Sequence, residues 1–175
     1  GEPTMYCDEL ARIFQVIRKT ECHFPVMNTN GMLLKQNHVT ELLANSPLVM
    51  VNISRHHYND DVNAEIMGYN SSTNNLSYAI KSISPNRIRL QCNLIGGYID
   101  TYGEIMQFIA YSHHALKVKN IAFALLTPLP QGSYYKEEII DYVKRHSVNL
   151  DDILEQIGGN KHFVFEKYRG GVACY

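Results

Sequence analysis

The feature that most restricts the fold is a set of short, nearly continuous apolar runs separated by helical patterns. Residues 48–53 and 121–126 are apolar at almost every position, without the alternation of a strand that has one face in water. Such runs are typical of parallel strands covered on both faces, and each follows an amphipathic helical pattern. We therefore predict an α/β chain built from right-handed parallel units.

Hydrophobic periodicity and turn residues give the expected order of elements. Helices are predicted at residues 5–19, 33–44, 76–83, 102–115, 135–145 and 150–157. Strands are predicted at residues 24–28, 48–53, 87–94, 121–126 and 162–168. The polar, Asn-rich stretch 59–75 is expected to form a connection between two of these units, apart from any helix or strand.

Length and charge exclude several classes of protein. The 175 residues suit one domain, and 45% apolar against 19% charged residues argues against disorder. The 16 Lys and Arg nearly cancel the 17 Asp and Glu, so no nucleic-acid partner is expected. No stretch has the ~20 apolar residues of a membrane span, and no signal segment is visible, so we expect a cytoplasmic protein without a membrane partner.

The cysteines and histidines give no metal-binding pattern. Cys7, Cys22, Cys92 and Cys174 are separated by 14, 69 and 81 residues, so C-x-x-C spacing is absent and reduced thiols are expected. The pairs 56–57 and 113–114 are histidines, but adjacent strand residues point to opposite faces, so each pair offers one ligand at most. No metal site is predicted.

Polar residues follow the predicted strands where each strand ends. Asn28, Ser54, Asn93 and Thr127 all occupy such positions. The carboxyl ends of parallel strands meet at one edge of a sheet, and ligands of α/β proteins bind there. A binding site at this edge is therefore expected.

The motifs at this edge resemble those of the radical S-adenosylmethionine (SAM) superfamily. Each motif alone is common, but their order and their separation by one helix-strand unit make the combination specific. The resemblance covers residues 1–131 and is nearest to the molybdenum-cofactor-biosynthesis and activating-enzyme branches. Its motifs are Gly1-Glu2-Pro3-Thr4, Asn28-Thr29-Asn30-Gly31, Asn52-Ile53-Ser54 and Cys92-Asn93-Leu94.

The resemblance implies a partial parallel βα barrel that lacks its first strands. Residues 1–148 would form this barrel and residues 149–175 a truncated helix-strand extension. Such a barrel holds SAM against a 4Fe-4S cluster, and reductive cleavage gives a 5′-deoxyadenosyl radical. The oxidoreductases and activating enzymes of the superfamily share this step.

The resemblance also assigns residues to cofactor binding. The first loop would take the methionine ammonium group, with Glu2 and backbone carbonyls as partners. Ser54 and Arg55 would lie near the methionine carboxylate, Asn93 near the ribose or carboxylate, and residues 125–128 beside adenine. The full set is Gly1, Glu2, Pro3, Thr4, Asn28, Asn30, Ser54, Arg55, Asn93 and Leu126.

One departure from the family limits what this chain is expected to do. The cluster is held by a C-x-x-x-C-x-x-C loop that precedes the Gly-Glu-Pro motif, and the chain starts at that motif. No catalytic residue and no metal ligand is therefore assigned. We expect a fragment or shortened relative of a radical SAM enzyme, inactive by itself and binding neither SAM nor cluster alone.

Other interpretations stay open at this point. The chain could be a non-catalytic interaction module, or a homodimer that pairs through an uncovered sheet edge. An unrelated barrel enzyme is disfavoured, because no nucleophile elbow or phosphate-binding glycine loop is present. Each site residue also has a structural reading: Glu2 solvated, residues 28–31 only a turn, Ser54 a helix cap, Asn93 a satisfied polar residue, and Arg55 exposed.

Overall fold

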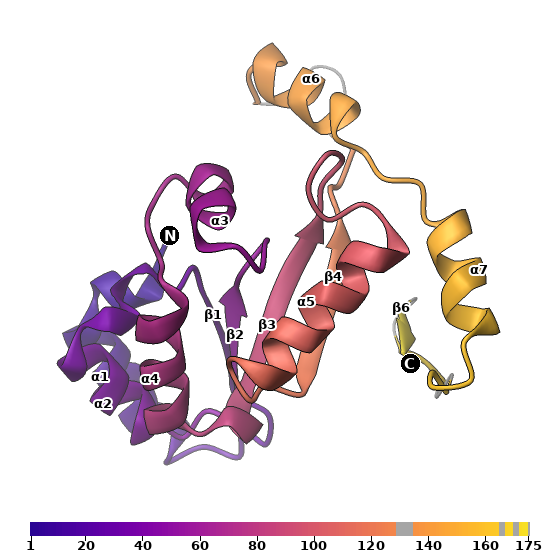
Figure 1. The fold of residues 1–175 in the computed structure, drawn as a ribbon. Helices are drawn as coiled ribbons and strands as arrows, with labels where there is room; N and C mark the ends of the chain where they lie inside the picture. The colour runs from indigo at the N-terminus through magenta and orange to yellow at the C-terminus, as the bar shows by residue number, and fades with distance from the viewer. Residues whose placement is uncertain (129–134, 165–166, 170–171, 175) are drawn as a thin grey trace.

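Four parallel strands form the central sheet of the protein. A computed structural model describes residues 1–128, 135–164, 167–169 and 172–174, with side chains as far as residue 164. The strands β1 (Val26–Thr29), β2 (Met50–Ser54), β3 (Ile88–Leu94) and β4 (Asn120–Leu125) lie side by side in chain order (Figure 1). All three pairings are parallel, which confirms the predicted α/β class. The barrel implied by the resemblance stays a prediction.

Helices connect the strands and cover one side of the sheet. In Figure 1, α5 lies in front of β3 and β4, and α4 stands to the left of the strands. None of the helices described is long and apolar enough to cross a bilayer. The α-helices are α1 (Cys7–Ile17), α2 (Asn37–Ala44), α3 (Asp60–Met67), α4 (Thr73–Ile83), α5 (Tyr102–His114), α6 (Glu137–Arg145) and α7 (Asp151–Gly159), with 3₁₀ helices at Pro3–Met5, Met32–Lys35 and Pro85–Arg87.

Helix α3 is the element that the sequence prediction missed. The polar stretch 59–75 contains all of α3 and the first turn of α4. Asn59 caps α3, since its Oδ1 accepts hydrogen bonds from the backbone N–H groups of Asp61 (2.9 Å) and Val62 (3.2 Å). Gly68 ends the helix in left-handed geometry at φ 74°. These end signals were readable, but the weak apolar pattern between them concealed the helix.

The two faces of the sheet differ sharply in burial. Val51, Ile53, Leu90 and Cys92 are at most 1% exposed beneath the helices. Alternate residues on the other side are all half-buried or exposed, so the expectation that both faces are covered is wrong. We call this second side the open face; it carries Val26, Asn28, Met50, Asn52, Ser54, Arg89, Gln91, Asn93, Asn120, Ala122 and Ala124.

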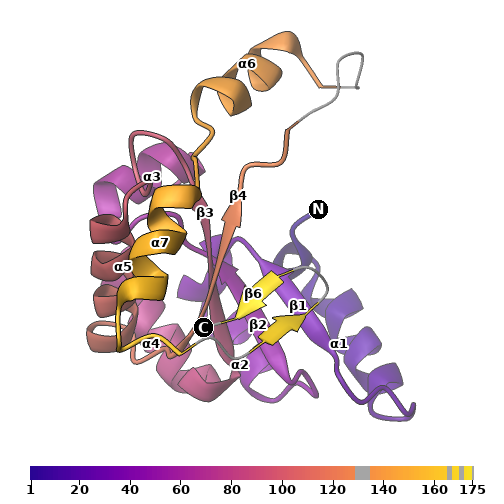
Figure 2. The same cartoon turned by 90° about the vertical axis from the view of Figure 1, so that its right-hand side faces the viewer.

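The C-terminal part attaches through α7 and through the segment before it, where the His146 carbonyl and ring both bond to the backbone of Gly96. Ile153 of α7 is 3% exposed within the main core, whereas α6 has no buried residue and stands away from the body in Figures 1 and 2. Residues 162–164 are not in a strand, because the backbone turns where Phe163 N–H donates to Asn160 O. The predicted strand 162–168 is therefore reduced to β5 (Lys167–Arg169), which pairs antiparallel with β6 (Val172–Cys174). Residues 165–166 lie outside the described part, and the division at residue 148 stays a prediction.

Candidate functional site

The predicted polar residues Asn28, Ser54 and Asn93 all lie on the open face, at or near the carboxyl ends of their strands. The register places Asn28 beside Asn52, Ser54 beside Gln91, and Asn93 beside Ala124. Within the described residues, the side chains of Ser54 and Asn93 form no hydrogen bond. Because Asn59 caps α3, the reading of Ser54 as a helix cap is wrong. Both side chains are free to contact a ligand.

Glu2 fastens the first loop to the end of β1. Its Oε1 accepts from Thr4 N (3.1 Å), Thr4 Oγ1 (2.6 Å) and Thr29 Oγ1 (2.7 Å). Its Oε2 accepts from the backbone N–H of Asn30 at 2.7 Å. The first two motifs, which are 27 residues apart in sequence, are therefore joined by one carboxylate. The reading of Glu2 as freely solvated is wrong.

These hydrogen bonds control the protonation of Glu2. Partial burial by itself raises the pKa of this carboxyl, but the donors from Asn30, Thr4 and Thr29 together outweigh burial and hold the pKa below its usual value of 4.5. A carboxyl with a lowered folded-state pKa stabilises the fold above its unfolded pKa. That stabilisation is lost as the pH falls through the folded value.

We expect Glu2→Gln to loosen the first loop at neutral pH. The glutamine amide has only one acceptor oxygen and cannot take the donors on both sides, so exchange of the Asn30 amide hydrogen should speed up at least tenfold. In urea unfolding, the deficit of the variant should be present at pH 7 and should be smaller at a pH below the lowered folded-state pKa of wild-type Glu2, where that carboxyl is protonated. Glu9→Gln, on the exposed side of α1, is the matched control. An equal deficit at both pH values would contradict this assignment.

The second motif forms a turn as well as lying at the candidate site. Asn30 Oδ1 accepts from Met32 N–H at 2.9 Å, and Gly31 adopts φ 80°. A Cβ at Gly31 would lie 3.0 Å from Ile53 Cγ2, so glycine is required there for both backbone geometry and space. The Tyr69 hydroxyl donates to Asn30 O. The structural reading of this motif is correct, and ligand contacts by Asn28 and Asn30 stay predictions.

Arg55 does not face the candidate site. It is 0% exposed and lies on the helix-covered side, one residue out of step with Ser54. Its Nε donates to His57 O and its Nη1 to Ser71 O, both at 2.7 Å, and its Nη2 lies 2.6 Å from Asp60 Oδ1. The predicted contact with the methionine carboxylate is therefore wrong, and so is the alternative of an exposed arginine.

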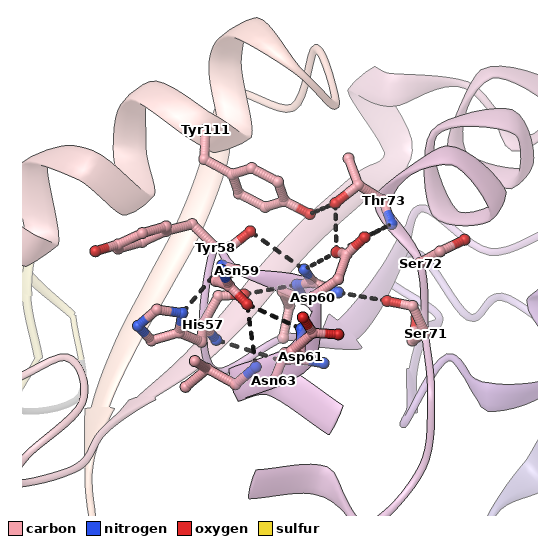
Figure 3. Close-up of polar contacts among 12 residues, drawn as sticks. His57, Tyr58, Asn59, Asp60, Asp61, Asn63, Ser71, Ser72, Thr73 and Tyr111 are labelled. Atoms are coloured by element: carbon pink, nitrogen blue, oxygen red, sulfur yellow. Dashed lines mark hydrogen bonds and ion pairs between the residues drawn. The ribbon is translucent and has the colours of Figure 1, made fainter. Parts of the chain in front are cut away.

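A polar network around Asp60 holds this arginine in place (Figure 3). Asp60 also accepts from the backbone N–H and the hydroxyl of Thr73, and that hydroxyl lies 3.1 Å from the Tyr111 hydroxyl. Burial alone raises the pKa of Asp60, but the Thr73 and Arg55 donors reverse this and lower it. The Arg55 guanidinium lies 5.3 Å from the centroid of the Tyr111 ring. Arg55 thus joins β2, α3, α4 and α5.

His56, which the sequence analysis considered only as a metal ligand, lies beside the carboxyl edge of the open face. Its backbone N–H donates to Asn63 Oδ1 at 2.9 Å, and its Nδ1 accepts from the backbone N–H of Asn93 at 3.0 Å. Burial lowers the pKa of His56 to about 4, so the ring is neutral at pH 7 and carries its proton on Nε2. Successive strand residues alternate between the two faces, so the position of His56 two residues after Ser54 was the sequence signal that places its ring on the open face.

The remaining predicted residues fall into distinct surroundings. Thr4 is 1% exposed and its hydroxyl donates to Glu2, so its side chain holds the loop together, and a ligand contact through the loop carbonyls stays a prediction. Pro3 begins the first 3₁₀ helix, and Gly1 is exposed. Leu126 is half-buried directly after β4, at the carboxyl edge. Ligand contacts by these three residues stay predictions.

The cysteines with described side chains do not fit a cluster site. Cys7 Sγ contacts Thr4 O at 3.4 Å and Cys22 is exposed on its own. Cys92 is buried on the helix-covered side, where burial raises the pKa of its thiol. Within this described part, no three His, Cys, Asp or Glu side chains come together as metal ligands would. The side chain of Cys174 lies outside it.

An open-faced parallel sheet with its polar rim at the carboxyl edge defines the class of fold. The sequence matches no protein family model and no curated protein. Among solved structures, the fold is similar to that of SuiB from Streptococcus suis. SuiB bound to S-adenosylmethionine matches with a TM-score of 0.56 at 19% identity, over 85% of this chain and 37% of SuiB.

Two further structures of SuiB give the same result. SuiB without a named ligand matches with a TM-score of 0.57 at 18% identity, over 83% of this chain and 35% of SuiB. SuiB bound to the precursor peptide SuiA matches with a TM-score of 0.56 at 18% identity, over 95% and 41%. This chain therefore spans well under half the length of SuiB. At this identity the likeness establishes the fold alone.

Proposed function

We propose that this chain provides the S-adenosylmethionine-binding rim of a radical SAM enzyme, as a fragment or shortened relative. The observation that carries the proposal is the placement of Ser54 and Asn93. Both side chains lie at the carboxyl edge of the open face without a hydrogen-bond partner among the described residues. The Glu2 loop stands at the same edge, fastened to the end of β1. A SuiB structure that shares this fold contains S-adenosylmethionine.

The rim residues suit different parts of the proposed ligand. Among the described residues, Glu2 Oε2 accepts from one donor, the Asn30 N–H, and retains a lone pair for the methionine ammonium group. Ser54 and Asn93 offer hydroxyl and amide groups to the carboxylate and the ribose. His56 Nε2–H adds a donor beside Asn93. Leu126, half-buried after β4, suits an adenine ring.

We propose no electron transfer by this chain alone. A 4Fe-4S cluster is the group that supplies the electron for cleavage in radical SAM enzymes, and it requires thiolate ligands. Among the described cysteines, Cys7 is half-buried, Cys22 is exposed and Cys92 is buried, and together they do not provide such a set. The proposed role of the chain is to bind and orient the ligand.

Titration with S-adenosylmethionine, followed by NMR of the ¹⁵N-labelled chain, tests the proposal. We expect weak binding in the high micromolar to millimolar range, because the cluster that would chelate the amino and carboxylate groups is missing. Ser54→Ala and Asn93→Ala should each raise the Kd about three- to tenfold, the loss of a hydrogen bond worth roughly 0.5–1.5 kcal/mol. Asn74→Ala, exposed on α4, should leave the Kd unchanged.

Two outcomes would count against the proposal. One is the absence of any shift in the resonances of residues 52–56 and 91–95 at saturating ligand. The other is binding that Ser54→Ala and Asn93→Ala leave unchanged, since the ligand would then occupy another surface.

A second candidate function is an interaction module without catalysis. The observation in its favour is that β1 and β4 each pair with a single strand in the described sheet. Unpaired strand edges offer backbone donors and acceptors to another chain, so a homodimer is the natural form of this alternative. A concentration-dependent dimer in light scattering, combined with no response to S-adenosylmethionine, would favour it.

A further inference from the structure

A row of polar residues crosses the open face below the rim. The register places Asn28 on β1 beside Asn52 on β2, Asn52 beside Arg89 on β3, and Arg89 beside Asn120 on β4. We call these four residues the polar row. Faces of parallel sheets are ordinarily apolar, because helices cover them. No helix among the described residues covers the open face, so its polar residues are compatible with water, and it is their unpaired groups that point to a partner.

Hydrogen bonds within the row satisfy only part of it. Asn52 Nδ2 donates to Asn28 Oδ1 at 2.7 Å, and Arg89 Nε donates to Asn120 Oδ1 at 3.0 Å. These bonds leave both Nη groups of Arg89 without a partner among the described residues. They also leave Asn52 Oδ1 without a donor. Among the described residues, this is the buried side-chain polar atom that has no hydrogen bond.

The charge of Arg89 is not compensated by the described side chains. The ion pair among them is that of Arg55 with Asp60, on the opposite side of the sheet. Arg89 is half-buried, so its guanidinium has given up part of its hydration. A partly desolvated guanidinium with two free Nη groups matches the two oxygens of a carboxylate.

The orphan oxygen of Asn52 restricts the ligand further. The amide nitrogen of Asn52 donates to Asn28, so the Oδ1 of the same amide group points away from Asn28. A buried acceptor without a donor is costly, by roughly 1–3 kcal/mol. A ligand that satisfies the whole row must therefore bring an N–H donor as well as an anionic group.

Asn28 belongs to both the polar row and the predicted S-adenosylmethionine site, but the rest of the row lies below Ser54 and Asn93. Ser54 lies two residues beyond Asn52 on β2, and Asn93 lies four residues beyond Arg89 on β3. At a rise of about 3.3 Å per residue, these side chains are ~7 Å and ~13 Å further along the strands. A ligand on the row would lie below one bound at the rim.

We propose that the polar row is a subsite for a carboxylate-bearing part of the substrate, namely an acidic amino-acid residue. Arg89 pairs with the carboxylate, and Asn52 Oδ1 accepts from a backbone N–H of the same residue. The inference rests on the proposed function in one respect: it takes the molecule bound at the open face to be the substrate of the proposed enzyme. Binding at the row does not itself require S-adenosylmethionine.

Titration of the whole chain with N-acetyl-glutamate amide, followed by the Arg89 side-chain Nε–H resonance, tests the proposal. We expect saturable binding in the millimolar range, at least tenfold tighter than that of N-acetyl-glutamine amide or inorganic phosphate. Arg89→Gln should raise the Kd at least tenfold. Arg12→Gln, on the exposed side of α1, should leave the Kd unchanged.

Asn52→Leu separates binding from folding. Removing the orphan oxygen should leave the urea midpoint unchanged or higher, while the Kd for N-acetyl-glutamate amide rises at least fivefold. Equal binding of the glutamine and glutamate probes, binding of phosphate as tight as that of the glutamate probe, or full binding by Arg89→Gln would each overturn the subsite.

The rim and the row can fail independently. Asn93→Ala should weaken S-adenosylmethionine and leave the glutamate probe unaffected, whereas Arg89→Gln should do the reverse. Loss of probe binding in Asn93→Ala would contradict two separate sites. Absence of S-adenosylmethionine binding with intact glutamate binding would refute the proposed function and leave the row in place.

Discussion

Arg55→Met is expected to cost the protein about 2–3 kcal/mol of unfolding free energy, because it leaves two buried carbonyls without a donor and removes the ion-pair partner of Asp60, whose side chain is 37% exposed. Methionine occupies a similar volume but donates nothing. The carboxylate of Asp60 and the carbonyls of His57 and Ser71 would lose their partner within the covered side of the sheet. Urea unfolding at pH 7 measures the loss.

Two further variants make this expectation specific to the buried ion pair. Arg12→Met, on the exposed side of α1, should change stability by less than about 0.5 kcal/mol. Arg55→Met combined with Asp60→Asn should recover part of the loss, because it removes the unpaired carboxylate. A stable Arg55→Met variant with weakened S-adenosylmethionine binding would instead restore this arginine to the ligand site.

His56 is expected to make the protein less stable in mild acid. Its folded pKa is about 4, below the usual 6.5, so the unfolded chain binds the proton more readily. The contribution of His56 to the free energy of unfolding is therefore fully present above pH 6.5 and is lost as the pH decreases toward 4. At about 1.4 kcal/mol per pKa unit, the loss over this window is about 2–3 kcal/mol.

His56→Asn isolates this contribution. The asparagine Oδ1 can stand where Nδ1 accepts from Asn93 N–H, but it does not titrate in this range. Unfolding free energies at pH 7.5 and pH 4.5 should differ by about 2–3 kcal/mol less in the variant than in the wild type. His38→Asn, exposed on α2, should keep the wild-type pH dependence. An unchanged pH dependence in His56→Asn would show that the ring is not held neutral.

Much of the fold was predictable because the relevant signals are local. Apolar runs and helical spacing predicted the four parallel strands and most helices to within a few residues. Helix α3 was missed because its apolar pattern is weak, although Asn59 and Gly68 mark its ends. The strand at 162–168 was overextended, because a β-prone composition does not reveal the turn that Asn160 makes after α7.

Some residues of the candidate site were predicted correctly and others were not. Asn28, Ser54 and Asn93 were correctly predicted to lie near the carboxyl ends of parallel strands, because polar residues interrupt each apolar run there. Arg55 was misplaced, although successive strand residues point to opposite faces and Ser54 already occupied the open side. The neutral His56 ring was missed because its partner is a backbone N–H from another strand.

The sequence by itself determined the order of the elements, their parallel direction and the end of the sheet at which polar residues gather. These features follow from periodicity and from the right-handedness of parallel connections, which need no knowledge of distant contacts. Only the tertiary structure decided which distant residues meet and which groups remain unpaired. The bonds of Glu2 to Asn30, of Arg55 to Asp60, and the free guanidinium of Arg89 depend on strand register and helix packing, which bring together residues that are far apart in the chain.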